Sequence, residues 1–327
     1  MGLILGIFTW IMFLIFTHFP ILVETVYTNG VYRLIRFVHS ITLTYIPFPL
    51  LYLVIAIVIF LFIRRIFTKQ EKNWLFFLIN FGGWIVVLFY WLWGFNYARE
   101  EFHVRTDLKI ELPEKEFLYT ELIAADSILL GIRKDLQLND TTALDLQHFP
   151  ISVEDKVQNA QIKVLKKLDE PIFSKPKVRQ LKPRGSLLRI KTAGVYFPWA
   201  LEGHIDDGLH PIEKPYVMAH EMAHAYGLTD EGVCNFIGFM TCINADDPFI
   251  QYSGWLEYQG YLYRALKRNY PEVIDEKKYR LPVAVSTDLM AIRERLNLYP
   301  DILPGLRDFF YNNYLKAQGV SAGMKSY

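Results

Sequence analysis

The residues with the clearest chemical potential are His220-Glu221-Met222-Ala223-His224, which match the pattern H-E-x-x-H. Residues four apart on a helix share one face, so the two imidazoles can point at a single ion. Zinc accepts neutral imidazole nitrogen, and a catalytic zinc site keeps one position open for water. Glu221 follows the first ligand, where its carboxylate can take a proton from that water. The motif therefore predicts a Zn²⁺ site with His220 and His224 as ligands and Glu221 as the catalytic base.

Two acidic residues compete for the place of third ligand. Gly227 permits a turn after the motif, and Thr229 or Asp230 can cap a following helix whose first turn contains Glu231. A helix that folds back beside the first would bring Glu231 to the metal. Asp230 stays the alternative, because His-Glu-x-x-His-x-x-Gly-x-x-Asp also resembles short-spaced zinc peptidases in which the last residue is a ligand. Asn235 lies one turn further on, placed to orient a ligand by a hydrogen bond.

Hydrolysis of a peptide bond also needs a donor for the negative charge that develops on the carbonyl oxygen. Tyr252 and His210 are candidates for this catalytic role, and Tyr196 is a weaker one. Their structural alternatives are a core tyrosine, a surface histidine and a strand tyrosine. The strand near Val195 could bind an extended peptide along its edge. A polar cluster ahead of the motif indicates a solvated loop that could rim the cleft; it comprises Glu202, His204, Asp206 and Asp207.

The spacing of hydrophobic residues predicts the helices and strands that position these candidate residues. Short strands are expected at 187–191 and 194–197, after a turn at Pro183-Arg184-Gly185. Helices are expected at about 116–136, 153–168, 217–226, 230–243, 255–268 and 283–296. The sequence therefore predicts a mainly α chain, in which an α+β zincin-like metallopeptidase domain with a small sheet occupies residues 98–327.

The first 97 residues have a different character. Three apolar runs, at about 3–23, 47–63 and 75–97, approach the roughly 20 residues that a helix needs to cross a bilayer. Trp91 and Trp93 lie near the end of the third run, as in an aromatic belt. The first run lacks the basic start and small-residue cleavage site of a signal peptide. A transmembrane region of three helices is therefore expected, with the lipid bilayer as a partner.

Charges between the runs predict the orientation. Four basic residues follow the second run (Arg64, Arg65, Lys69 and Lys72), against Arg33 and Arg36 in the loop before it. The more basic loop is expected in the cytoplasm. The amino terminus is then cytoplasmic, and residues 98–327 lie outside.

Composition narrows the class of protein. Hydrophobic residues make up 52% of the chain and charged residues 21%, which is too apolar for an ordinary soluble protein. A net charge of +1 gives no reason to expect nucleic acid as a partner. Cys234 and Cys242 would lie roughly 12 Å apart on a helix, too far for a disulfide, and are expected to be buried apolar residues.

The stretch 220–236, HEMAHAYGLTDEGVCNF, resembles an uncharacterised family of bacterial multi-pass membrane proteins, classed as a domain of unknown function with an H-E-x-x-H motif. The resemblance extends to the leading spans, to 194–198 and to 251–254, and covers most of the chain. That family is similar to the gluzincins, which implies His220, His224 and Glu231 as ligands and Glu221 as base. Many gluzincins carry their glutamate much farther downstream, and this sequence departs from them there.

We therefore expect a membrane-anchored zinc metallopeptidase of the bacterial inner membrane, acting on envelope or periplasmic proteins or peptides. The alternative is a non-catalytic, zinc-containing membrane binding or assembly factor. A structural zinc site closes all four positions with protein ligands, often cysteine, and has no need of Glu221. A transporter is disfavoured, because the apolar runs carry almost no charge.

Overall fold

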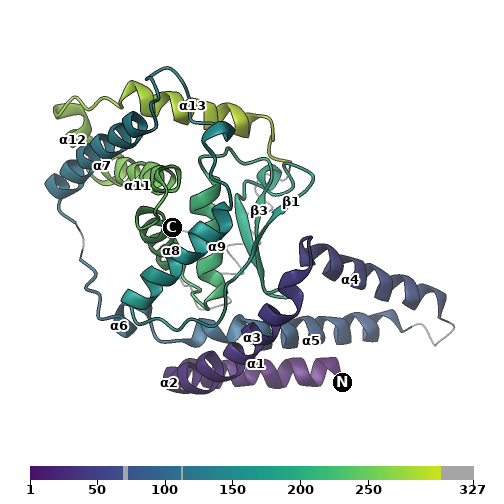
Figure 1. The fold of residues 1–327 in the computed structure, drawn as a ribbon. Helices are drawn as coiled ribbons and strands as arrows, with labels where there is room; N and C mark the ends of the chain where they lie inside the picture. The colour runs from purple at the N-terminus through teal and green to yellow at the C-terminus, as the bar shows by residue number, and fades with distance from the viewer. Residues whose placement is uncertain (69–72, 112, 303–327) are drawn as a thin grey trace.

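The computed structural model describes residues 1–68, 73–111 and 113–302 (Figure 1). This part of the chain is mainly helical with one small sheet, as predicted. The elements before the sheet are α1 (Gly2–His18), α2 (Pro20–Leu22), η1 (Val23–Tyr32), α3 (Arg33–Ile41), η2 (Leu43–Tyr45), α4 (Leu50–Phe67), α5 (Trp74–Leu92), η3 (Gly94–Ala98), α6 (Phe102–Arg105), α7 (Lys115–Asp135), η4 (Leu146–His148) and α8 (Val153–Lys167). The remaining elements are β1 (Val178–Leu181), η5 (Leu188–Ile190), β2 (Gly194–Phe197), β3 (Glu202–Asp206), α9 (Lys214–Ala225), α10 (Glu231–Ile243), α11 (Pro248–Asn269), α12 (Pro271–Glu276) and α13 (Val283–Asn297).

Two helices, α4 and α5, are long and apolar enough to cross a membrane. A third span exists only if α1 and the segment from Pro20 to Tyr45 count as one, and the two are bent by 113°. The helix α1 ends at His18 because Phe19 leaves the helical conformation (φ −132°, ψ 64°) and Pro20 has no amide hydrogen to continue the ladder. The expected straight span over 3–23 is therefore too long.

The segment between α1 and α4 was expected to be a loop, and this prediction is wrong. It is helical from Pro20 to Ile41 and lies against the domain that follows α5. Arg36 is buried there, where it donates to the Leu201 carbonyl at 2.5 Å and to Ser174 at 3.3 Å. These hydrogen bonds from Arg36 attach the segment to the domain. Lys69 and Lys72, two of the charges used to predict orientation, lie outside the described residues.

Glycines allow α1 and α5 to pack closely. A Cβ on Gly6 would lie 2.9 Å from the Cα of Gly83, and one on Gly83 would lie 2.2 Å from the Gly2 carbonyl oxygen. Small residues four apart are a common way for helices to approach one another in lipid. The amino group of Met1 also donates to Asn80 at 3.0 Å. In Figure 1, α4 and α5 extend from the domain to the right, and α1 lies along α5 with the amino terminus on the same side.

The sheet has the order β1-β3-β2, with β1 parallel and β2 antiparallel to β3. The strand predicted at 194–197 is confirmed as β2, whereas 187–191 contains the short helix η5. Three of the four polar residues expected on a solvated loop, Glu202, His204 and Asp206, lie in β3, the central strand, in which every residue is buried. Alternation along β3 explains this: Gly203 faces α9, and Glu202 and His204 face the segment that leads into α4. Asp207 follows the strand and is half-buried.

The remaining helices agree with the predicted ones to within a few residues, except that α11 begins seven residues earlier, at Pro248. Its start follows from Asp247, whose side chain accepts from the amides of Phe249 and Ile250. The helix α9 lies between the sheet and α10, and its buried apolar face supplies Met218, Ala219 and Met222 to a common core. This packing fixes α9 between two rigid neighbours.

Candidate metal centre

The centre is built on a hairpin of two helices, α9 and α10. The first begins with Pro215 in its first turn and ends before Gly227, whose φ of +79° is a conformation that glycine adopts without strain. A side chain at 227 would also collide with Asn96, 2.8 Å away. Asp230 then begins α10 by accepting from the Val233 amide at 2.8 Å. The chain thus reverses within five residues, and the start of α10 returns beside α9.

This reversal brings His220, His224 and Glu231 together. Each offers one ligand atom, and the three atoms lie within 4.8 Å of one another. A carboxylate oxygen of Glu231 is 3.1 Å from Nε2 of His220 and 3.6 Å from Nε2 of His224. All three side chains are at most 17% exposed. Two imidazole nitrogens and one carboxylate oxygen form the donor set that zinc prefers at sites with an open position.

The other ring nitrogen of His224 is held by the backbone. Its Nδ1 lies 2.8 Å from the carbonyl oxygen of Leu228, and a carbonyl can only accept. Nδ1 therefore carries a hydrogen, and in the neutral ring Nε2 presents its lone pair toward Glu231. The Cys234 thiol lies 3.3 Å from the same Nδ1 and is buried, as expected for this cysteine. Such a partner fixes the tautomer and orientation of a metal-binding histidine.

The electrostatics of the cluster favour a positive charge at its centre. Burial opposes ionisation of both groups, yet His224 and His220 hold the pKa of Glu231 far below its usual value. In turn, Cys234 and Glu231 outweigh burial and raise the pKa of His224. An anionic carboxylate at this position attracts either protons or a cation. The donor set and its charge therefore fit a divalent metal ion.

Glu221 lies on the same helix, turned toward the sheet. It is 4% exposed, and its Oε2 has no hydrogen-bond partner in the described part of the chain. A Cβ on Gly194 would lie 2.6 Å from Glu221 Oε1, and one on Gly203 would lie 2.9 Å from Glu221 Cβ. These glycines leave the space that the side chain occupies. Burial raises the pKa of Glu221 to about 7, against the opposing effect of the two histidines.

The structure gives other roles to Asp230 and Asn235. Asp230 caps α10, and the cluster of ligand atoms among the described residues does not include it. Asn235 accepts a hydrogen bond from the Tyr216 hydroxyl at 3.2 Å, so it joins α10 to α9. The sequence could not reveal this pairing, because it depends on how the two helices meet.

The structure also shows where the three residues predicted as donors to the carbonyl oxygen lie. The Tyr252 hydroxyl donates to Asp288, a carboxylate that Arg133 also binds, in a fully buried network between α7, α11 and α13. His210 is buried in the turn before α9, where Nδ1 accepts from the Ile212 amide at 3.4 Å. Both are therefore committed to other partners. Tyr196 is near the cluster: its ring lies 6.3 Å from that of His224, and its hydroxyl is buried without a partner among the described residues.

Membrane-side elements contact the end of α9 directly. Trp93, just after α5, donates to the His224 carbonyl at 2.8 Å, and Tyr32 of η1 donates to that of Ala225 at 2.8 Å. Arg99 donates to the Gly227 carbonyl at 3.2 Å and pairs with Glu24 at 2.8 Å. These bonds satisfy carbonyls that a helix end leaves open. Sequence reasoning assigned Trp93 to an aromatic belt and missed this contact.

Comparison with known proteins agrees with the resemblance noted above. The family model described as "Protein of unknown function (DUF3810)" matches residues 27–327, so the chain belongs to this family. No curated protein and no solved structure matches the chain.

Proposed function

We propose that the protein is a membrane-anchored, zinc-dependent metallopeptidase of the gluzincin type. The observation that carries the proposal is the convergence of His220, His224 and Glu231 within 4.8 Å, beside the buried carboxyl group of Glu221. His220, His224 and Glu231 would hold the ion. Zinc, when bound, supplies a Lewis acid that polarises a peptide carbonyl and makes water a better nucleophile.

The protein itself would contribute to hydrolysis by proton transfer through one fixed side chain, that of Glu221. Glu221 has a pKa of about 7 because of its burial, so near neutral pH it can both accept and release a proton. As a base it would take a proton from the attacking water, and as an acid it would pass that proton to the amine that leaves. Gly194 and Gly203 hold its carboxyl group in one place, which reduces the cost of ordering it during the reaction.

A non-catalytic zinc protein is the alternative, and two observations weigh against it. The described residues supply three converging ligand atoms, whereas a structural site closes four. Cys234, a further potential donor, contacts Nδ1 of His224 and is not part of the three-atom cluster. A binding or assembly factor would also have no use for a buried acid with an unpartnered oxygen.

The helices that could span a membrane suggest where the substrate lies. Trp93 places the centre within one side chain of the end of α5, so we propose substrates held close to the bilayer, such as loops of membrane proteins or peptides in the envelope. The amino terminus contacts Asn80, in the half of α5 away from the domain. Together with Arg64 and Arg65, this supports a cytoplasmic amino terminus and a periplasmic domain in a bacterial inner membrane.

Glu221→Gln tests the catalytic assignment, because glutamine keeps the shape of the side chain and removes its basicity. The purified full chain in detergent is loaded with zinc and incubated with a broad peptide library. We expect wild type and variant to bind about one zinc each, and hydrolysis by the variant to fall by roughly 10²- to 10⁴-fold. Zinc binding with equal cleavage by both would refute the role of Glu221, and cleavage by neither would refute the peptidase.

A further inference from the structure

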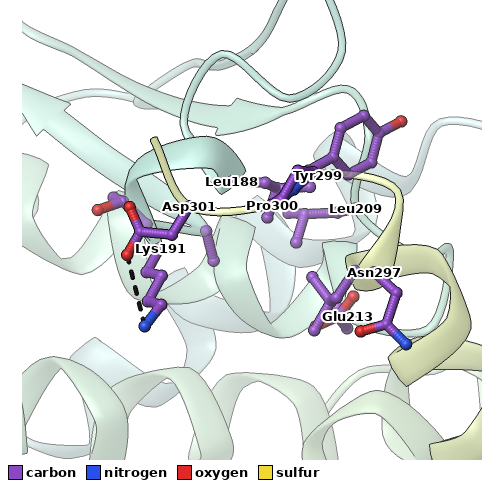
Figure 2. A pocket seen from close by; sticks show the side chains of 11 residues that line it. Leu188, Lys191, Leu209, Glu213, Asn297, Tyr299, Pro300 and Asp301 are labelled. Atoms are coloured by element: carbon purple, nitrogen blue, oxygen red, sulfur yellow. Dashed lines mark ion pairs between the residues drawn. The ribbon is translucent and has the colours of Figure 1, made fainter. Parts of the chain in front are cut away.

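A cavity of about 470 Å³ lies beside the start of β2 (Figure 2). Its walls come from three segments: the residues that lead into β2, the turn before α9, and the end of α13 with the residues that follow it. The volume lies in the range of roughly 300–1,000 Å³ that is typical of ligand sites. Much of the lining is apolar, with Leu188, Ala193, Leu209 and Pro300 among its residues.

The wall from the end of α13 is fixed to the rest of the cavity. Tyr299 packs so closely that a Cβ on Gly185 or Gly208 would lie 2.4 or 2.8 Å from its ring. The Ile302 amide donates to the Arg189 carbonyl at 2.9 Å, which ties the segment after α13 to η5. These contacts come from residues far apart in the sequence, so the cavity belongs to the folded domain.

The charged groups of the lining are two carboxylates and one ammonium. Lys191 and Asp301 form an ion pair at 3.4 Å on one side, drawn as a dashed line in Figure 2. Glu213 and Asn297 lie on the opposite side of the lining in Figure 2. One oxygen of Glu213 accepts from the His210 amide at 3.0 Å, and no lysine or arginine among the described residues pairs with it. Burial also raises the pKa of Glu213 to about 7.

The cavity is adjacent to the candidate metal centre through the backbone. Ala193 lines it, and the next residue, Gly194, is the one that a Cβ would drive into Glu221. Gly194 also begins β2, an edge strand of the sheet. A peptide extended along that edge would carry side chains past the cavity mouth, since alternate side chains of a strand point to the same face.

We propose that this cavity binds a basic side chain, lysine or arginine, of the peptide substrate, with the Glu213 carboxylate as counter-ion. The apolar lining suits the methylene stem of such a side chain, and the half-buried Glu213 carboxylate suits its charged end. The identity of the ligand as part of a peptide rests on the proposed peptidase function. The preference for a cation rests on the cavity alone.

The test uses two small probes of equal shape, butylguanidinium and the neutral butylurea. Their binding to the full chain in detergent is measured by calorimetry in the presence of EDTA, so that neither metal nor hydrolysis contributes. We expect wild type to bind butylguanidinium at least about tenfold more tightly than butylurea. Glu213→Gln retains an acceptor for the His210 amide and should abolish this discrimination. Asn297→Asp, at an exposed position on the same side of the lining as Glu213, should increase it.

Glu116→Gln is the matched control, because this exposed acid pairs with Lys277 away from the cavity, and it should behave as wild type. Equal binding of the two probes by wild type, or unchanged discrimination in Glu213→Gln, would overturn the proposal. Failure of the peptidase is a separate result: the library would stay uncut while the probes still bind. If the peptidase holds, Glu213→Gln should lower kcat/KM for substrates with a basic residue about tenfold or more and leave neutral ones unchanged.

Discussion

At the scale of single residues, the position of Glu221 depends on two residues that have no side chain. Gly194 and Gly203 lie on neighbouring strands, and both face the part of α9 that carries the motif. The carboxyl group is enclosed and its Oε2 has no hydrogen-bond partner in the described part of the chain, so packing contributes to its location. A catalytic base held in this way is sensitive to one added methyl group.

Gly194→Ala should therefore displace the Glu221 carboxylate while leaving the three ligand residues in place. We expect hydrolysis to fall by about 10²-fold, the loss that follows from a shift of roughly 1 Å, with zinc content unchanged. Gly131→Ala is the control, since a Cβ there meets nothing within 4 Å in α7. It should keep full activity and gain up to about 1 kcal/mol of stability. Full activity in Gly194→Ala would show that Glu221 is not confined as described.

At the scale of elements, the junction between the sheet and α4 carries buried charge. Glu202 of β3 accepts from the Leu50 amide at 3.0 Å, in the first turn of α4. Arg179 of β1 donates to the carbonyls of Thr44 and Ile46 at 2.9 and 2.8 Å. The sheet thus satisfies backbone groups at the entry to a candidate span, where a helix start leaves its amides without partners.

His204 makes this junction sensitive to acid. The side chain is fully buried on β3, 3.7 Å from Glu202, and burial lowers its pKa to about 4. The unfolded chain, with a histidine pKa of about 6.5, binds more protons between these two values. Stability from His204 is therefore complete above about pH 6.5 and is lost as the pH falls toward 4, by roughly 3 kcal/mol at most.

Denaturant unfolding of wild type and His204→Gln in detergent, at pH 7 and pH 4.5, measures this contribution. The free energy of unfolding of wild type should fall more steeply with acid than that of the variant. Burial also raises the pKa of Glu202, so this carboxyl group adds its own pH dependence. Because both proteins retain Glu202, comparing how steeply their unfolding free energies change with pH removes its contribution. Parallel profiles would mean that His204 is not held neutral by the fold.

At the scale of the whole molecule, sequence reasoning succeeded where the evidence is local. The spacing of His220 and His224 and the turn at Gly227 predicted a helical hairpin, because both depend on a few neighbouring residues. Glu202 of β3 was misread, since its partner Leu50 lies more than a hundred residues away in the sequence. Tyr252 was misjudged for the same reason: Asp288 and Arg133, which hold it, are remote in sequence.

The candidate spans show the same difference between features that depend on local sequence and features that depend on tertiary contacts. Apolar length predicted α4 and α5, but the break at Phe19 and the docking of residues 20–45 on the domain depend on tertiary contacts. Those contacts join the candidate spans to the end of the helix that carries the motif, through Tyr32, Trp93 and Arg99. The proposed metal centre and the candidate membrane spans therefore form one packed unit.

The measurement that tests the central claim most directly is the zinc content and affinity of Glu231→Gln and Asp230→Asn beside wild type. Both variants exchange a carboxylate for an amide of the same shape, and asparagine still caps α10. We predict about one zinc per chain in wild type and Asp230→Asn, and at least about tenfold weaker binding in Glu231→Gln. No zinc in wild type, or loss of zinc in Asp230→Asn but not in Glu231→Gln, would contradict the account.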